Sequence, residues 1–293
     1  MKTSPNILVI LPSWIGDTIM SQSLLFELKR IHKDCNIDVI ARPYISELIN
    51  LIPEINKKIF LDINHGSFGL SERLNLVNEI KKNNYTDVYI LPNSFKSAIV
   101  PWLARIPNRI GYTTEFRQML LTKKYKYKKH ERTMVDRYLH LANCKYNSQI
   151  QPKLNISAQY QRSIIEKFQI KIDKKIIMLC PDAEFGNAKK WPVEHWLSLA
   201  KLFREQDFSV FFLGKDDSIN KYISNNSYYE FNNLNIVNIF YLLIFEIIFY
   251  FWSFITNENN LSDWSINYPK KLDIIPISKI IIYYLGALIY YYI

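Results

Sequence analysis

Short aliphatic runs alternate with longer amphipathic segments through the first 150 residues of the chain. The runs have the length and the β-branched composition of buried strands, and the segments between them have the spacing of helices. The predicted strands are Ile7–Leu11, Ile37–Ala41, Lys58–Leu61, Asp87–Leu91 and Arg109–Tyr112. The predicted helices are Ile19–His32, Ser46–Leu51, Leu70–Lys82, Lys96–Ala104 and Thr133–Ala142. Strands that alternate with helices predict βαβ units and a parallel sheet.

A polar stretch, Asn143–Ile156, contains Pro152 and is predicted to be a linker. A second alternating unit follows it. Its predicted elements are helix Ala158–Phe168, strand Lys175–Leu179, helix Val193–Glu205 and strand Ser209–Leu213. The pattern therefore predicts an α/β protein with two Rossmann-like domains, residues 1–150 and 151–293, that face each other across a cleft.

The pattern changes after Gly214, and the second domain is expected to be atypical and incomplete beyond about residue 220. The segment Ile236–Ile255 is almost continuously aliphatic and aromatic, and it is as long as a transmembrane helix. Glu246 would lie near its centre, at a cost of roughly 2.5–3.5 kcal/mol if it behaves as Asp does there. A membrane-anchored protein is therefore one alternative interpretation of the chain.

Composition narrows the class of protein and of partner. A hydrophobic content of 48% with 22% charged residues is typical of a globular chain. The net charge of +10 favours an anionic partner, whether a nucleic acid, a phosphorylated glycolipid or a membrane surface. The three cysteines, Cys35, Cys144 and Cys180, are widely spaced, which argues against a disulfide framework or zinc site and fits a reducing compartment. The apolar run near the start is too short for a signal peptide.

The loop after the first predicted strand is the first candidate for chemistry. It contains Gly16 followed by Asp17. Ligands of open α/β sheets bind at the carboxyl ends of the strands. A carboxylate at that edge is well placed to act as a general base. The alternative is that Asp17 only caps the helix that follows.

Two more loops occupy equivalent positions. Asn93, Ser94 and Lys96 lie where the strand ending at Leu91 meets a helix, a place that suits phosphate binding, although an ordinary capped helix start is the alternative. After the first strand of the second domain, Lys189 or Lys190 could stabilise the charge that builds up on a pyrophosphate leaving group.

A basic stretch with interleaved tyrosines runs from Lys123 to Arg132. Such a run is usually a solvated face. It could also contact anionic headgroups, where each cation contributes about 1 kcal/mol. Nucleic-acid binding is a third option, but no RNA- or DNA-binding motif accompanies the run.

Taken together, these segments resemble the ADP-heptose:lipopolysaccharide heptosyltransferases of glycosyltransferase family 9, and heptosyltransferase II more closely than heptosyltransferase I. The resemblance runs from about Ile7 to about Gly214. Several matching blocks in the same order carry it, which is far more specific than any one of them. The blocks are Leu11–Thr18, Met20–Ser23, Leu91–Ala98, Ile106–Gly111, Asp136–Tyr138, Ala183–Gly186 and Ala188–Pro192.

The resemblance implies a GT-B glycosyltransferase whose amino-terminal domain binds the lipopolysaccharide inner-core acceptor and whose carboxyl-terminal domain binds ADP-heptose. It implies an inverting transfer that needs no metal and no other cofactor. The expected location is the cytoplasm, with peripheral attachment at the cytoplasmic face of the inner membrane of a Gram-negative bacterium. Nucleic acid is not an expected partner.

The resemblance also assigns roles to individual residues. Asp17 matches the general base, and Lys189 matches the lysine that neutralises the departing ADP phosphates. The expected acceptor-binding residues are Ser13, Asn93, Ser94, Lys96, Arg109 and Arg117. The expected donor-binding residues are Glu184, Gly186, Lys190, Gly214, Thr256 and Asn257.

The chain departs from the family in the donor domain. The family has a Thr-Asn-Asp-Ser-Gly loop with a following His, whereas Ile255–Leu261 reads Ile-Thr-Asn-Glu-Asn-Asn-Leu and Asp263 stands where the His is expected. Asp182 replaces a Gly in the other donor loop. Added carboxylates repel a diphosphate, and loss of Gly hinders close backbone approach. A shifted reading frame in an AT-rich gene would give an amino-acid sequence of this kind beyond about residue 220. An inactive remnant of a heptosyltransferase is therefore a second alternative.

Overall fold

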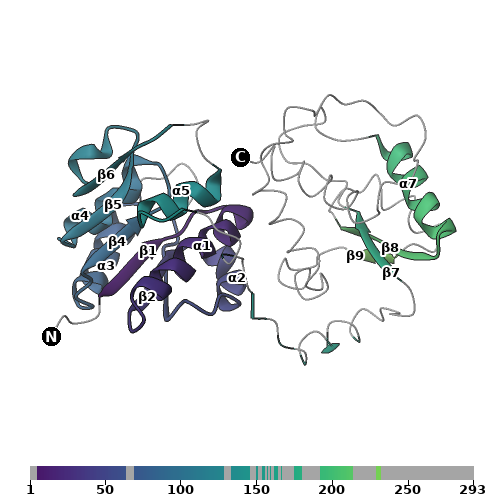
Figure 1. Ribbon diagram of the computed structural model, residues 1–293, viewed down its shortest axis with the longest axis horizontal. Helices are drawn as coiled ribbons and strands as arrows, with labels where there is room; N and C mark the ends of the chain where they lie inside the picture. Colours follow the sequence, from purple (N-terminus) through teal and green to yellow (C-terminus); the bar gives the residue numbers. More distant parts are fainter. Residues whose placement is uncertain are drawn as a thin grey trace. The chain divides into compact units, whose positions relative to one another are not determined.

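The computed structural model describes residues 5–63, 69–128, 133–145, 175–179, 192–213 and 229–231, together with single residues between 150 and 166 (Figure 1). The chain divides into two compact units, Met1–Asn155 and Ile156–Ile293. The first unit includes most of the predicted linker Asn143–Ile156. Two side chains of that segment, Ile150 and Leu154, are buried. The backbone N–H of Asn155 also donates a hydrogen bond of 2.6 Å to the carbonyl of Leu51.

The first unit contains a six-stranded sheet in the order β3-β2-β1-β4-β5-β6, and every neighbouring pair is parallel. Its strands are β1 (Asn6–Ile10), β2 (Asn36–Ala41), β3 (Lys57–Phe60), β4 (Asp87–Ile90), β5 (Asn108–Thr113) and β6 (Lys123–Lys126). All six carboxyl ends therefore lie at one edge of the sheet. The strand order reverses between β1 and β4, and the loops that follow these two strands form the topological switch point at which open α/β sheets bind ligands.

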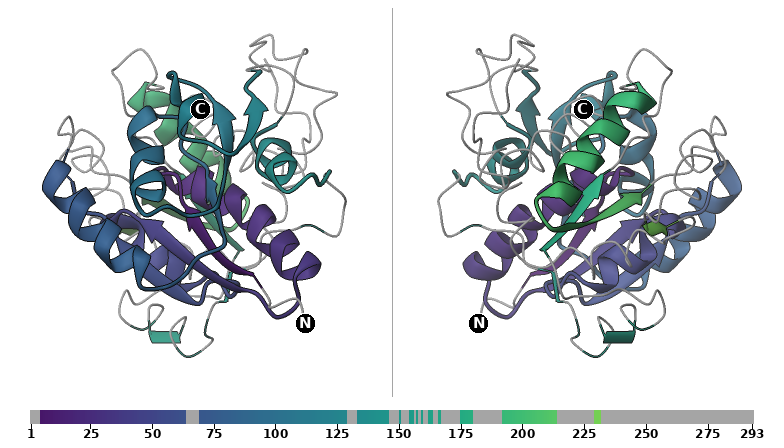
Figure 2. Two further views of the ribbon diagram at one scale, coloured as in Figure 1. Left: turned by 90° about the vertical axis from the view of Figure 1, so that its left-hand side faces the viewer. Right: turned by 90° about the vertical axis from the view of Figure 1, so that its right-hand side faces the viewer.

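Helices cover both faces of this sheet, with α1 and α3 on opposite sides (Figure 2). The α-helices are α1 (Ile15–Ile31), α2 (Ser46–Asn50), α3 (Leu70–Lys81), α4 (Ile99–Leu103) and α5 (Met134–Leu141). Three short 3-10 helices accompany them, η1 (Pro43–Ile45), η2 (Phe95–Ala98) and η3 (Arg117–Met119). Helix α5 packs beside α1, so these two helices share one face of the sheet.

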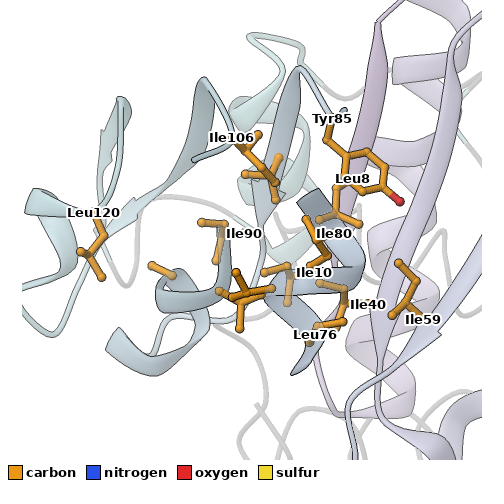
Figure 3. Close-up of a cluster of buried hydrophobic side chains, with 14 of the residues drawn as sticks. Leu8, Ile10, Ile40, Ile59, Leu76, Ile80, Tyr85, Ile90, Ile106 and Leu120 are labelled. Carbon is orange, nitrogen blue, oxygen red and sulfur yellow. The ribbon is translucent and has the colours of Figure 1, made fainter. Parts of the chain in front are cut away.

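A cluster of buried hydrophobic side chains, mostly aliphatic, fills the space between the sheet and helices α3 and α4 (Figure 3). The central strands are apolar at nearly every position because both of their faces are covered. In β1, for example, Leu8 and Ile10 belong to this cluster, while Ile7 and Val9 are buried in the opposite direction of the pleat. The parallel pairing of β1 with both β2 and β4 sets its register, and with it the position of the loop that follows.

The described part of the second unit is a small βαβ arrangement. Strands β7 (Lys175–Leu179), β8 (Phe208–Leu213) and β9 (Tyr229–Phe231) are parallel and adjacent in that order. Helix α7 (Val193–Glu205) packs one apolar side against β8. Trp196, Leu199 and Phe203 of the helix meet Val210 and Phe212 of the strand.

The predicted strands of the first unit all form, with ends that differ by at most one residue. One prediction was wrong. Helix α1 begins at Ile15 rather than Ile19, so Gly16 and Asp17 are helical and not part of a loop. The lysines of Lys123–Lys126 are exposed, as a solvated face requires, but the run also forms the edge strand β6, which was not predicted. The ring of Tyr125 packs against Tyr112 and His140, while the lysines of the strand stay exposed.

Within the described residues, no helix is both long enough and apolar enough to span a bilayer. The apolar run Ile236–Ile255 lies outside the described residues, as does most of the predicted helix Ala158–Phe168.

Candidate functional site

Asp17 lies at the carboxyl edge of the first sheet, in the first turn of α1 and directly after β1. The N-cap of this helix is Trp14, whose backbone is extended and whose side chain caps no N–H. Asp17 therefore does not cap the helix, and the alternative interpretation of this residue was wrong. Its carboxylate still benefits from the positive end of the helix dipole.

The turn that carries Asp17 is held by Thr18. This buried hydroxyl donates to the carbonyl of Trp14 at 2.9 Å and lies 3.3 Å from the carbonyl of Pro12. The backbone N–H of Thr18 also donates to Trp14 at 2.9 Å. Because these bonds satisfy the carbonyls that precede the helix, the entry into α1 is rigid and fixes the direction of the neighbouring carboxylate.

Burial raises the pKa of Asp17 to about 6, and the positive charge of Arg137 opposes that rise. The side chain is half-buried, but its Oδ1 atom is buried and accepts no hydrogen bond from any described residue. A carboxylate with a pKa near 6 is ionised at neutral pH and is a stronger base than an exposed Asp, as general base catalysis requires.

Arg137 belongs to helix α5, and its side chain contacts Tyr127, which follows β6. Thr133 caps α5, and its Oγ1 accepts a hydrogen bond of 3.1 Å from the backbone N–H of Asp136. One guanidinium nitrogen of Arg137 lies 3.2 Å from the Tyr127 hydroxyl, and the guanidinium sits 5.2 Å from the centre of that ring. The sequence had placed Arg137 in a family block, Asp136–Tyr138, without a role, and the structure brings its charge to Asp17.

The loop after β4 carries three of the predicted acceptor residues, and β4 is the neighbour of β1. Asn93 and Lys96 are exposed there and Ser94 is half-buried. Ser94 is the N-cap of η2, but its side chain caps no N–H. The first N–H of η2, that of Phe95, instead donates a hydrogen bond of 2.8 Å to the Glu115 carboxylate. The start of η2 is therefore capped from another loop, and the capped helix start stays open beside phosphate binding.

Arg117 has a different role from the predicted one. Its side chain is fully buried, at 0% exposure, so it cannot contact an acceptor directly. Its guanidinium donates to the carbonyl of Tyr112 at 2.7 Å, to the carbonyl of Pro92 and to the Ser97 hydroxyl at 2.9 Å. Arg117 therefore shapes the loop after β4 from beneath.

Arg109, also predicted to bind the acceptor, lies away from the other predicted acceptor residues. It lies near the amino-terminal end of β5, where it pairs with Val88 of β4. Its guanidinium donates to the carbonyls of Leu120 at 2.7 Å and Ile106 at 2.5 Å. It is thus at the opposite edge of the sheet from Asp17, where its bonds hold the connection between β5 and β6.

Ser13 lies with Asp17 at the carboxyl edge, since both follow β1. Its side chain is exposed, and its carbonyl accepts a hydrogen bond from the hydroxyl of Tyr44, which follows β2. The structure therefore gathers five predicted site residues at one edge of the first sheet. They are Ser13, Asp17, Asn93, Ser94 and Lys96.

The predicted donor side lies outside the described residues. This applies to Glu184, Gly186, Lys189, Lys190, Gly214, Thr256 and Asn257. Among the residues that the structure does describe, no group of three or more His, Cys, Asp or Glu side chains could hold a metal ion.

Comparison with known proteins relates this arrangement to one family. The model of glycosyltransferase family 9 (heptosyltransferase) matches residues 73–238, which is more than half of the chain. Lipooligosaccharide heptosyltransferase 2 of Haemophilus influenzae is 36% identical over 234 residues, a match that covers 74% of this chain and 66% of that protein. Lipopolysaccharide heptosyltransferase 2 of Escherichia coli is 36% identical over 222 residues, covering 71% of this chain and 63% of its own length. The chain thus spans about two thirds of the length of these relatives.

The fold agrees with the sequence match. The solved structure of E. coli ADP-heptose lps heptosyltransferase II superposes with a TM-score of 0.70 at 30% identity, covering 84% of this chain and 76% of that one. The predicted resemblance to heptosyltransferase II is confirmed, and so is the α/β, GT-B fold class.

Proposed function

The chain belongs to glycosyltransferase family 9, the heptosyltransferases, and we propose that it transfers L-glycero-D-manno-heptose from ADP-heptose to the heptosyl-Kdo2-lipid A inner core of lipopolysaccharide. The observation that carries this proposal is the half-buried carboxylate of Asp17, with a pKa of about 6, at the switch point of the first sheet. The relatives that support it over heptosyltransferase I are named heptosyltransferase 2.

The proposed reaction is a single displacement with inversion. Asp17 takes the proton of the acceptor hydroxyl as that oxygen attacks the anomeric carbon of the heptose. The bond between that carbon and the β-phosphate oxygen breaks, and ADP leaves. Lys189 neutralises the charge that develops on the departing diphosphate. No metal ion and no other cofactor is needed, because one base and one cation serve the two ends of the displacement.

The acceptor belongs to the first domain in this proposal, and ADP-heptose to the second. The side chains of Ser13, Asn93, Ser94 and Lys96 would hold the acceptor, since they share the carboxyl edge with Asp17. Lys96 supplies an exposed positive charge for a phosphate of the inner core. Residues Glu184, Gly186, Lys190, Gly214, Thr256 and Asn257 would bind the donor. The expected location is the cytoplasmic face of the inner membrane, with peripheral attachment and no nucleic-acid partner.

A transfer assay with defined substrates tests the proposal. Purified protein is incubated with ADP-heptose and heptosyl-Kdo2-lipid A, and the heptosylated product is measured by mass spectrometry. Wild type is expected to give product, and Asp17→Ala is expected to lower the rate by about 10²–10⁴-fold. The control Asp34→Ala removes an exposed carboxylate at the other end of α1 and should leave the rate unchanged. Absence of product with wild type would favour the inactive remnant.

The lysines of the second domain are tested in the same assay. Lys189→Ala is expected to lower kcat by about 10²–10³-fold, because it removes a charge that acts mainly in the transition state. Lys190→Ala is expected to raise the KM for ADP-heptose and to change kcat little. Equal effects of the two substitutions on kcat would contradict the assignment of Lys189 as the leaving-group cation.

A further inference from the structure

We propose that the β6 edge of the first unit is a docking surface for an anionic lipid bilayer. The surface consists of the exposed side chains of Phe116 and Met119, which precede the strand, and of Lys123, Lys124 and Lys126, which belong to it. We call it the β6 surface. The inference rests on the proposed function in one respect only, namely that the acceptor is attached to a lipid.

The apolar part of the β6 surface is unusually exposed. Phe116 is 84% exposed and Met119 is 82% exposed, whereas the next large hydrophobic side chain among the described residues, Tyr44, is 61% exposed. Two such side chains three residues apart form an apolar protrusion. Adjacent exposed apolar side chains of this kind mark contact sites with partners or membranes.

The backbone holds Phe116 in this exposed position. Its φ is +56° and that of Glu115 is +45°, a left-handed conformation that bulky residues rarely adopt. The conformation is fixed on both sides, because the Glu115 carboxylate accepts a hydrogen bond of 2.8 Å from the N–H of Phe95 and the next residue, Arg117, is buried. Strain that the surroundings enforce is found at functional positions. The protrusion is therefore part of the fold.

The charged part lies on the strand that follows. Strand β6 is at the end of the sheet order, and its three lysines are exposed. Tyr125, between them, turns inward and packs its ring against Tyr112 and His140. The lysines form no ion pair with any described residue. They consequently present positive charge to solvent. Lys126 pairs with Thr113 at the carboxyl end of β5, which Phe116 follows, and Lys123 pairs with Ile110 further along the strand.

Lysines on an edge strand also prevent edge-to-edge pairing of sheets. That role accounts for the charges but not for Phe116 and Met119, which would promote association. Apolar side chains beside clustered lysines match a surface that is negatively charged at the headgroups and apolar below them. The combination favours an anionic bilayer over a second copy of the chain, because two copies would bring like charges together.

The position of the protrusion suits the proposed reaction. Phe116 follows the carboxyl end of β5, and Asp17 follows the carboxyl end of β1, so both lie at the same edge of one parallel sheet. A sugar that is attached to lipid A lies close to the headgroups. Contact between the β6 surface and the bilayer would bring the base to the level of that sugar.

Vesicle sedimentation with the full chain tests the proposal without donor or acceptor. The vesicles contain phosphatidylethanolamine and phosphatidylglycerol in a 3:1 ratio, or phosphatidylcholine alone. Wild type is expected to pellet with the anionic vesicles, and at least tenfold less with phosphatidylcholine or in 1 M salt. The double variant Phe116→Asn/Met119→Ser is expected to bind at least tenfold more weakly, and Asn tolerates the left-handed backbone at position 116. Replacement of the three lysines by Gln should weaken binding about fivefold per lysine.

Matched variants elsewhere on the first unit separate this surface from general effects. Ile31→Ser/Leu74→Ser removes two exposed apolar side chains outside the β6 surface, and Lys33→Gln/Lys81→Gln/Lys82→Gln removes three exposed lysines. Both should bind vesicles as wild type does. Equal losses in the control variants, equal binding to phosphatidylcholine or no binding by wild type would overturn the proposal. So would a dimer in sedimentation velocity that the Phe116/Met119 variant abolishes.

A second arm distinguishes failure of this proposal from failure of the proposed function. Transfer to a deacylated, soluble inner-core acceptor needs no bilayer, so the Phe116/Met119 variant should retain wild-type activity there. Vesicle binding without any transfer would contradict only the proposed function, and transfer without vesicle binding would contradict only the docking surface.

Discussion

The buried guanidinium of Arg117 donates a hydrogen bond of 2.9 Å to the hydroxyl of Ser97. This contact joins η3, which follows β5, to η2, which follows β4. Ser97 in turn donates to the carbonyls of Ser94 and Pro92. The loop that carries the exposed Lys96 is therefore supported from beneath by a charged side chain that itself has no access to solvent.

Loss of Arg117 is expected to destabilise the first unit. In Arg117→Met the carbonyls of Tyr112 and Pro92 lose their buried donor, which costs about 1–3 kcal/mol for each unsatisfied group. Arg117→Lys should recover only part of this, because an ammonium cannot reproduce the planar fork. Thermal or urea unfolding measures the difference. Arg105→Met removes an exposed guanidinium and should change stability by less than about 0.5 kcal/mol; an equal loss there would contradict the structural role of Arg117.

The transfer rate is expected to fall as the pH drops through about 6. Asp17 must be ionised to accept a proton, and burial raises its pKa to about 6. Below that value log kcat/KM should decrease by about one unit per pH unit. The profile is measured with saturating acceptor and limiting ADP-heptose in buffers of constant ionic strength. A rate that stays constant down to pH 4.5 would exclude Asp17 as the base.

The same residue should lower stability at neutral pH. The pKa of Asp17 is about 6 in the folded chain against an ordinary value of 3.8, so the folded state binds its proton more tightly than the unfolded state. This contribution to stability is present below about pH 4 and is lost as the pH rises through about 6. Asp17→Asn, which carries no charge, is expected to gain about 1–3 kcal/mol at pH 8 and nothing at pH 4. Urea unfolding at both pH values is the measurement, and a destabilised Asn variant at pH 8 is the contrary result.

Arg137 is expected to tune the acidity of Asp17. Its positive charge lowers the pKa of the carboxyl group, so Arg137→Gln should raise that pKa further. The acid limb of the pH–rate profile should then move to higher pH. Tyr127→Phe removes only the hydroxyl that lies 3.2 Å from the guanidinium, and should shift the limb less. A limb that does not move in Arg137→Gln would show that the two charges do not interact.

The central strands β1, β2 and β4 were predictable because burial on both faces leaves a largely apolar run. The strand β6 was missed since Lys123–Lys126 has one inward tyrosine between lysines, and a lysine-rich run is more often a solvated face. Alternation of Tyr125 and Tyr127 with lysines was the available signal. It has the period of a strand, but it is too short to decide by itself.

The start of α1 was placed too late because Pro12 and Gly16 are typical of a turn. The helix begins at Ile15 without a side-chain cap, so the sequence contained no N-cap signal to locate it. The position of Asp17 at the carboxyl edge of the sheet could nevertheless be predicted, because it depends on the first strand and not on the cap.

Arg109 and Arg117 illustrate the limit of site prediction. An arginine that binds a phosphate and an arginine that satisfies buried carbonyls have the same side chain, and both are near other functional residues in the sequence. Only the three-dimensional structure distinguishes them, since Arg117 is enclosed by the loop it supports and Arg109 lies at the far end of its strand.

All six strands of the first sheet come from residues 6–126, and the last helix of the unit ends at Leu141. The central strand β1 pairs with β2 and with β4, so its second neighbour is complete only after residue 90 has been synthesised. During translation the first unit can therefore form its whole core before any residue beyond Asn155 has left the ribosome. Folding of the first unit is thus decoupled in time from synthesis of the second, and a change in the later part of the gene would leave the first unit able to fold.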